Sequence, residues 1–291
     1  MDRRTMIAIG TLGVLASSCV CLAGSAALFA TGTERSPLAG AATVSATLAC
    51  AEPRAEADRA ILARRLDSLS IEHELTVVDP THLRVVLREV SGPRALSSLI
   101  ARGELEMTEV VEGATDVDPR SLGTGVRLEH PREGATAYHA TSPEQLAALA
   151  SHTPAGARFT ISCAESPGEE RDCEAFFLRV PAPIGTRDVA TAEAQIDEHS
   201  GTPQVAITFT PEGGRRFEEL TASLVDRRLA IVLDGRVMSA PVVMERIGGG
   251  RAVISLGVGG FEELLAEAYG IAAALRSGEP LGCAWEIQSM P

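Results

Sequence analysis

The sequence predicts an α+β protein, with an apolar N-terminal segment in front of a body of mixed helices and strands. Amphipathic helices and alternating strands follow one another along the chain, and turn residues separate them. Of the 291 residues, 45% are hydrophobic and 22% are charged, which is typical of a globular protein. The length suffices for one large domain or two modest ones.

The first part of the body predicts six elements in the order strand, helix, strand, strand, helix, strand. Apolar residues at helical spacing and acidic residues in the first turn indicate the first helix, and Asp79-Pro80 is a turn dipeptide between two strands. The expected ranges are 43–51, 55–70, 72–78, 81–90, 93–102 and 104–111. This order is the split βαβ, ferredoxin-like pattern.

The signals weaken over 112–183 and return in the last third of the chain. In the weak stretch we expect a helix over 142–151 and strands over 159–163 and 173–180. Beyond it, Pro211 starts a helix at a favoured first position, and Asp234-Gly235 is the strongest hairpin signal in the sequence. The other elements expected there are strands over 205–210, 229–233, 236–243, 251–256 and 283–289 and a helix over 261–275.

The N-terminal segment, 1–32, predicts a membrane anchor or a signal. Arg3 and Arg4 precede an apolar run over 6–30, which as a helix is long enough to cross a bilayer. This length favours an uncleaved, single-pass anchor with the arginines inside. Cleavage near Ser25-Ala26-Ala27 and lipidation at Cys19 remain the alternatives. A polar linker over 33–42 follows.

Four cysteines lie outside the apolar run, which suits disulfides in an oxidising compartment. Cys163 and Cys173 bracket a polar stretch with Gly and Pro, so we expect them to clip a loop between two strands. Cys50 and Cys283 lie at opposite ends of the body. If they pair, the first and last strands are neighbours.

The composition and motifs exclude several classes of function. A net charge of −13 argues against nucleic-acid binding. The chain has no lysine, which excludes Schiff-base chemistry and a Walker-type phosphate loop. The histidines have no metal-helix spacing, and no nucleophile has a base and an orienting group around it. We therefore expect no enzyme, no catalytic residue, no cofactor and no metal.

Two stretches resemble SecD, an accessory subunit of the bacterial Sec protein-export machinery. In the first, Ile61 to Leu69 is similar to the family's helix "ILRRRVDALG", and Glu104 to Val110 to its strand "AQLEFREV". The second, Pro203 to Arg276, carries the family's EGG helix start, "LAIVLDG", "SAPV", a Gly-rich turn and an "LRSG" ending in order. The family's "LDLxGG" before the first helix is missing.

The resemblance implies a large periplasmic domain made of a ferredoxin-like base and an inserted mixed α/β head. The base is expected over 43–111 and 282–291, and the head over 112–281. A base shared by the first and last strands brings Cys50 and Cys283 together. SecD continues into further membrane helices, whereas this sequence stops at Pro291, so we expect no proton coupling of its own.

The expected function is that of a binding module in the periplasm, held at the inner membrane by the N-terminal helix. Its expected partners are a translocating unfolded polypeptide or subunits of the Sec translocon, contacted by sheet edges or a groove. The alternative is a stand-alone envelope structural or interaction protein unrelated to export. The candidate polypeptide-binding residues lie in one apolar loop: Val237, Met238, Val242, Val243 and Met244. A buried crossover strand is the competing interpretation of that loop.

Overall fold

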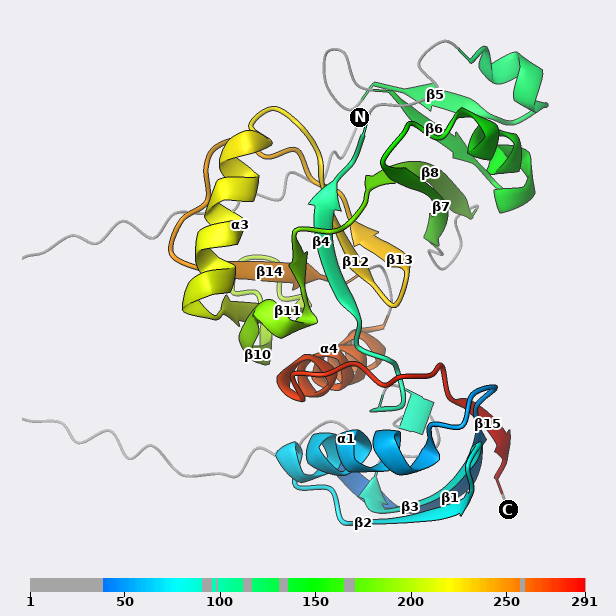
Figure 1. The fold of residues 1–291 in the computed structure, drawn as a ribbon, viewed down its shortest axis with the longest axis vertical. Helices are drawn as coiled ribbons and strands as arrows, with labels where there is room; N and C mark the ends of the chain where they lie inside the picture. The colour runs from blue at the N-terminus through cyan, green and yellow to red at the C-terminus, as the bar shows by residue number, and fades with distance from the viewer. Residues whose placement is uncertain are drawn as a thin grey trace, which may run out of the picture. The chain divides into compact units, whose positions relative to one another are not determined.

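The computed structural model describes residues 39–90, 96–97, 99–111, 117–130, 136–164, 171–256 and 260–290. Within these residues its architecture is mixed α and β, with four sheets and three α-helices of 13 to 16 residues (Figure 1). The N-terminal segment expected as an anchor or signal lies outside these residues. Among the residues described, no helix is long and apolar enough to span a bilayer.

The first sheet has the strand order β15-β1-β3-β2, and all its neighbours are antiparallel. It contains β1 (Ala39–Ala49), β2 (His73–Asp79), β3 (His82–Val90) and β15 (Glu286–Ser289). The helix α1 (Ala55–Ser68) covers it, with Leu62 and Leu66 buried against Leu83 and Leu87. These elements lie close to the ranges expected from the sequence, with β15 starting three residues late.

The strand expected over 104–111 forms as β4 (Leu105–Glu109), but its pairing differs from the expected order. β4 pairs with β12 (Leu229–Leu233) and with the two-residue β9 (Ile184–Gly185), in a sheet of order β13-β12-β4-β9. The position beside β1 is occupied by β15 instead. Leu105 and Met107 explain this choice, because they are buried in one core with Ile231 and Leu233.

The Asp234-Gly235 hairpin forms as expected, between β12 and β13 (Arg236–Ser239). Both turn residues have positive φ, 51° and 80°, as a tight hairpin turn requires. The expected strand over 236–243 ends early at Ser239. Pro241 follows two residues later and has no N–H to continue the ladder.

The stretch of weak signals forms a sheet of its own, of order β5-β6-β8-β7. Its strands are β5 (Arg127–Glu129), β6 (Ala137–Ala140), β7 (Ala157–Ala164) and β8 (Asp172–Arg179). The helix expected over 142–151 is a 3₁₀ helix, η2 (Pro143–His152), whose Leu146 and Leu149 pack with Tyr138 and Phe177 on one face of the sheet. A shorter 3₁₀ helix, η1 (Pro119–Leu122), precedes β5.

The last sheet, of order β10-β11-β14, contains β10 (Val189–Ile196), β11 (Pro203–Phe209) and β14 (Arg251–Ser255). A short 3₁₀ helix, η3 (Thr186–Asp188), leads into β10. The helix α3 (Pro211–Ser223) is capped by the preceding Thr210, whose hydroxyl accepts a 3.0 Å hydrogen bond from the Gly213 N–H. β10 was not expected from the sequence.

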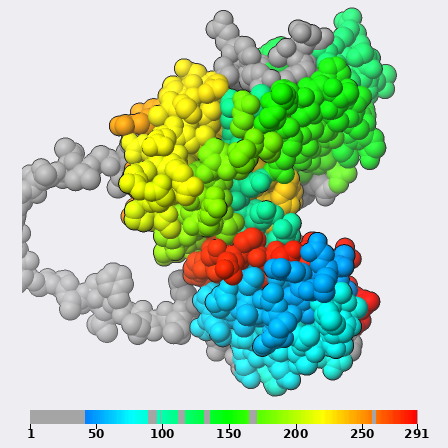
Figure 2. Space-filling model, viewed as in Figure 1, coloured from blue at the N-terminus to red at the C-terminus, as the bar shows by residue number. Residues whose placement is uncertain are grey.

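The helix α4 (Phe261–Arg276) contributes to two hydrophobic cores. Ile271 and Leu275 are buried with residues of β10 and β11, whereas Ala266 and Tyr269 pack against the core under α1. The space-filling view shows α4 directly against α1 (Figure 2). Because α4 belongs to both cores, the two regions are coupled by apolar packing.

Arg65, on α1, is buried beside residues 99–102, where the chain leaves the region of the first sheet. The segment that returns to this sheet passes next to the same residues. Its guanidinium donates to the carbonyl oxygens of Leu99 (3.2 Å), Ala101 and Arg102. Burial lowers the pKa of Arg65 to about 10, so it stays charged at neutral pH. Arg102 and Leu281 exchange hydrogen bonds of 2.9 and 3.2 Å, so the outgoing and returning segments run side by side.

Candidate functional site

The main candidate site is a groove of about 660 Å³ between two strands that each lie at the edge of a sheet. One side is formed by residues 161–164 of β7, and the other by residues 236–240, which include β13. Successive residues of a strand point to opposite faces. Since four successive residues of β7 line the groove, its edge as well as one face borders the space.

The groove has an apolar floor contributed by three different elements. Phe176 comes from β8, Val237 from β13 and Leu264 from α4, and all three side chains are buried. Met238 and Ile161 are half-buried beside them. The outer edge of β7 has no strand partner among the described residues, whereas the Val237 N–H of β13 already donates to Ser162. Apolar side chains beside such an edge suit an extended polypeptide, which offers both backbone hydrogen bonds and side chains.

The rim of the groove carries charges of both signs. Arg236 and Glu267 face each other with 3.6 Å between Nη2 and Oε1. On the opposite side, Asp172 lies 2.7 Å from Arg127 and within 3.1 Å of the ring of His139. Positive and negative groups are thus paired around the rim, so the rim has no strong preference for one sign of charge.

Arg228 joins the two sides of the groove beneath its floor. Its Nη1 donates to Glu174 on β8 at 2.5 Å, and its Nε donates to the Ala240 carbonyl at 3.0 Å. The guanidinium also lies over the Phe176 ring, 5.3 Å from its centre. A second link is the 2.8 Å hydrogen bond from the Val237 N–H to the Ser162 hydroxyl. These contacts set the spacing of the two edges.

The structure separates the five candidate polypeptide-binding residues. Val237 and Met238 line the groove. Val243 is 4% exposed in the core beside α3, and Met244 is 77% exposed at a loop outside the groove. Val242 is half-buried and forms an isolated bridge with Arg228. The groove residues that sequence reasoning missed are Phe176, Glu174 and Leu264, since no local pattern places them opposite β13.

Both disulfides join the pairs that the sequence suggested. Cys50 and Cys283 tie the end of β1 to the segment before β15. Cys163 and Cys173 are directly opposite each other on β7 and β8, and both strands line the groove at that point. Neither pair needs a metal, and within the described ranges no three His, Cys, Asp or Glu side chains cluster as metal ligands.

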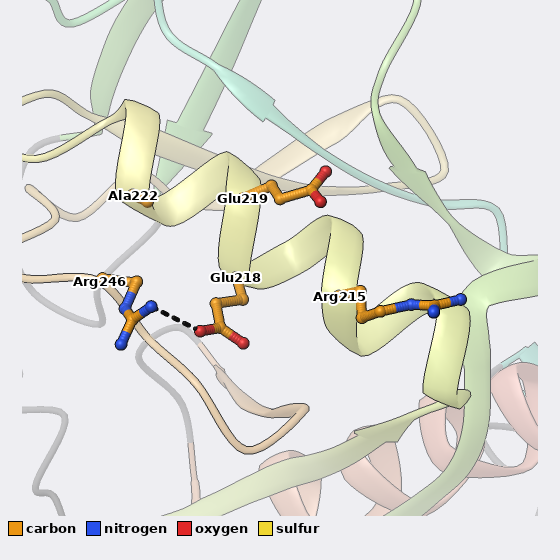
Figure 3. A pocket seen from close by; sticks show the side chains of 5 residues that line it. All are labelled: Arg215, Glu218, Glu219, Ala222 and Arg246. Carbon is orange, nitrogen blue, oxygen red and sulfur yellow. Dashed lines mark ion pairs between the residues drawn. The ribbon is translucent and has the colours of Figure 1, made fainter.

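A second, smaller pocket of about 250 Å³ lies along α3 (Figure 3). It is lined by Arg215, Glu218, Glu219, Ala222 and Arg246. Glu218 and Arg246 form an ion pair of 3.0 Å across it. Both partners of this pair are more than one-third exposed, where solvent screens their attraction. This pocket lacks the apolar floor of the groove, which makes it the weaker candidate.

Comparisons with known proteins agree with the architecture. Residues 164–279 match the family described as the SecDF P1 head subdomain. The chain is 34% identical over 232 residues to the protein translocase subunit SecDF of Thermus thermophilus, covering 77% of this chain and 26% of that protein. It is 49% identical over 87 residues to the protein translocase subunit SecD of Calditerrivibrio nitroreducens, covering 30% of this chain and 16% of that one.

Among solved structures, a crystal structure of SecDF in a super-membrane-facing form is similar with a TM-score of 0.54 and 28% identity. The match covers 89% of this chain and 32% of that chain. The chain belongs to the SecD and SecDF family and corresponds to a periplasmic-domain fragment of it. It spans about a quarter of the length of the Thermus relative.

Proposed function

We propose that this protein is an extracytoplasmic binding module of protein export, which holds a translocating polypeptide in the groove between β7 and β13. One observation carries the proposal: the edge strands of two sheets lie on either side of an apolar floor, which Phe176, Val237 and Leu264 form. An unfolded chain presents unpaired N–H and C=O groups together with apolar side chains. A groove of this kind satisfies both.

The family supports a role in export rather than an unrelated role in the envelope, because the relatives are named as protein translocase subunits. The proposed role is binding and not catalysis. We propose the Sec translocon as a second partner, also because the relatives are named as protein translocase subunits. By the same analogy, the protein resides at the inner membrane with its body in the periplasm.

We further propose a division into a ferredoxin-like base and a head. The strand order β15-β1-β3-β2, with α1 on one face, supports such a base. The pairing of β4 with β12 and β9 favours placing residues 104–111 with the head. The head then runs from about residue 104 to about residue 281. It lies between the segment over 99–102, which Arg65 contacts, and the segment that returns to the first sheet after Leu281.

Site-specific photo-crosslinking tests the proposal, with Met238 and Met244 as a matched pair. A photoreactive residue replaces each methionine in turn in the full-length protein, and an exported chain is stalled during translocation in membrane vesicles. We expect crosslinks to the stalled chain from position 238, in the groove, and none above background from position 244. Equal yields from both positions, or none from either, would contradict the groove as the binding site.

A binding assay with purified protein provides the quantitative test. The probe is a labelled ten-residue peptide of alternating apolar and polar residues without proline. Met238→Asp places a charge beside the apolar floor, so we expect about a tenfold loss of affinity, or about 1.4 kcal/mol. Met244→Asp is the control and leaves the affinity unchanged. Salt has little effect, because the rim charges are paired.

A further inference from the structure

The Cys163–Cys173 disulfide stands out because it belongs to the wall of the groove. β7 is an edge strand, paired with β8 on one side only. Cys163 pairs directly with Cys173, and among the described residues the pair Ala164 and Asp172 alone lies beyond it at that end of the ladder. The chain itself joins the two strands at this end through residues 165–171, so the disulfide is a second covalent tie that holds the last pairs of the ladder together.

The same end of β7 carries four residues that line the groove. Ile161, Ser162, Cys163 and Ala164 all line it, and the Ser162 hydroxyl accepts the hydrogen bond from Val237 across the groove. Fraying of the last pairs removes this acceptor and the ordered edge together. Binding of a polypeptide to β7 then costs the conformational entropy of ordering that edge, in addition to the conformational entropy of ordering the polypeptide.

The two sulfur atoms differ in their access to solvent. Cys173 is fully buried in the core under η2, whereas Cys163 is half-buried and lines the groove. A thiolate that approaches from the groove therefore reaches Cys163. A polypeptide bound in the groove covers the same path.

We propose that the Cys163–Cys173 disulfide is a redox control of the groove: the oxidised form holds the β7 edge ready for binding, and reduction weakens binding. This inference rests on the proposed function of the groove and names its regulation. The reductant is a dithiol, whose thiolate attacks the Cys163 sulfur and displaces the Cys173 thiolate. The second thiol of the reductant then releases Cys163, so two electrons and two protons pass to the protein and the dithiol becomes a disulfide.

Thermodynamic linkage predicts a second measurable effect of this redox control, on the midpoint potential of the cysteine pair. If reduction weakens peptide binding by a certain factor, saturation with peptide must stabilise the disulfide against reduction by the same factor. For a tenfold effect, the midpoint potential of the cysteine pair falls by about 30 mV when the groove is filled. A disulfide with a structural role alone shows no such coupling.

The test uses the full chain with Cys50→Ala and Cys283→Ala, which removes the other disulfide of the described residues. Among those residues, a dithiol then reduces Cys163–Cys173 alone. Binding of the labelled alternating peptide is measured before and after treatment with dithiothreitol, and circular dichroism checks the fold in both states. We expect about a tenfold weaker binding after reduction. The protein with Cys163→Ala and Cys173→Ala, which keeps the other disulfide, provides an independent comparison and behaves like the reduced form.

The outcomes separate this inference from the proposed function. Peptide binding of equal affinity in the oxidised, reduced and Cys163→Ala/Cys173→Ala proteins overturns the redox control and leaves the groove as the binding site. Absence of binding by the oxidised wild-type protein overturns the proposed function, and this inference with it. A midpoint potential that does not change when peptide saturates the groove also counts against the redox control.

Discussion

Asp58 and Trp285, 227 residues apart in the sequence, are joined by a buried hydrogen bond of 2.9 Å from the indole Nε1 to a carboxylate oxygen. The other oxygen of Asp58 accepts from the Gly282 N–H at 3.1 Å. Arg54, one turn earlier on the helix, lies 3.6 Å from the same carboxylate. Together with the Cys50–Cys283 disulfide, this contact anchors the returning segment to α1 before it forms β15.

Replacement of Asp58 by Ala is expected to lower the free energy of unfolding by about 3 kcal/mol, because the buried indole of Trp285 and the half-buried N–H of Gly282 lose their charged acceptor. Urea denaturation followed by circular dichroism measures the loss. Asp67→Ala is the control, since Asp67 is an exposed acid on the same helix and should change stability by no more than about 0.5 kcal/mol. Similar losses from the two variants would show that Asp58 does not hold the returning segment.

Replacement of Arg65 by Met leaves the carbonyl oxygens of Leu99 and Ala101 without their side-chain donor, whereas the carbonyl of Arg102 keeps the N–H of Leu281. We expect a loss of about 3 kcal/mol in the free energy of unfolding. The neighbouring Arg64→Met is the control, because Arg64 is exposed and pairs only with the exposed Glu279 at 3.2 Å in the described structure. Amide hydrogen exchange in residues 99–104 should rise in the Arg65 variant and stay unchanged in the Arg64 variant.

Arg228 is expected to be a positioning residue for the groove. Arg228→Met removes the hydrogen bonds to Glu174 and Ala240, so we expect about 2 kcal/mol lower stability and weaker binding of the alternating peptide. The double variant Arg228→Met/Glu174→Met should lose less stability than the sum of the single variants, because no charge is left unpaired. Strict additivity in denaturation experiments would argue that the two side chains do not interact.

The turn between β2 and β3 contains a carboxyl group with a clear pH dependence. Hydrogen bonds from His82 and from the backbone and hydroxyl of Thr81 lower the pKa of Asp79 to about 2. A depressed carboxyl pKa stabilises the fold above the unfolded value of 3.8, and this contribution is lost as the pH falls from about 4 to about 2. In an NMR titration, His82→Ala should raise the pKa of Asp79 toward 3.8. The control His73→Ala should leave it unchanged.

Local sequence patterns were enough to predict most of the helices and strands. The Asp234-Gly235 hairpin, the start of α3 at Pro211 and the alternation in β11 depend on residues within a few positions of one another. The Cys163–Cys173 disulfide was expected from the sequence, because the two cysteines bracket a short loop. The Cys50–Cys283 pair stayed open until the resemblance to SecD implied that the first and last strands share one base.

Tertiary structure alone decided which strands pair and where the groove lies. β4 fits beside β1 or beside β12 by its local pattern, and burial of Leu105 and Met107 with Ile231 selects β12. Likewise, Ser162 and Val237 are 75 residues apart in the sequence and meet because the edge strands β7 and β13 come together. Contacts of this range depend on how loops close and which apolar faces are buried together. No local pattern contains that information.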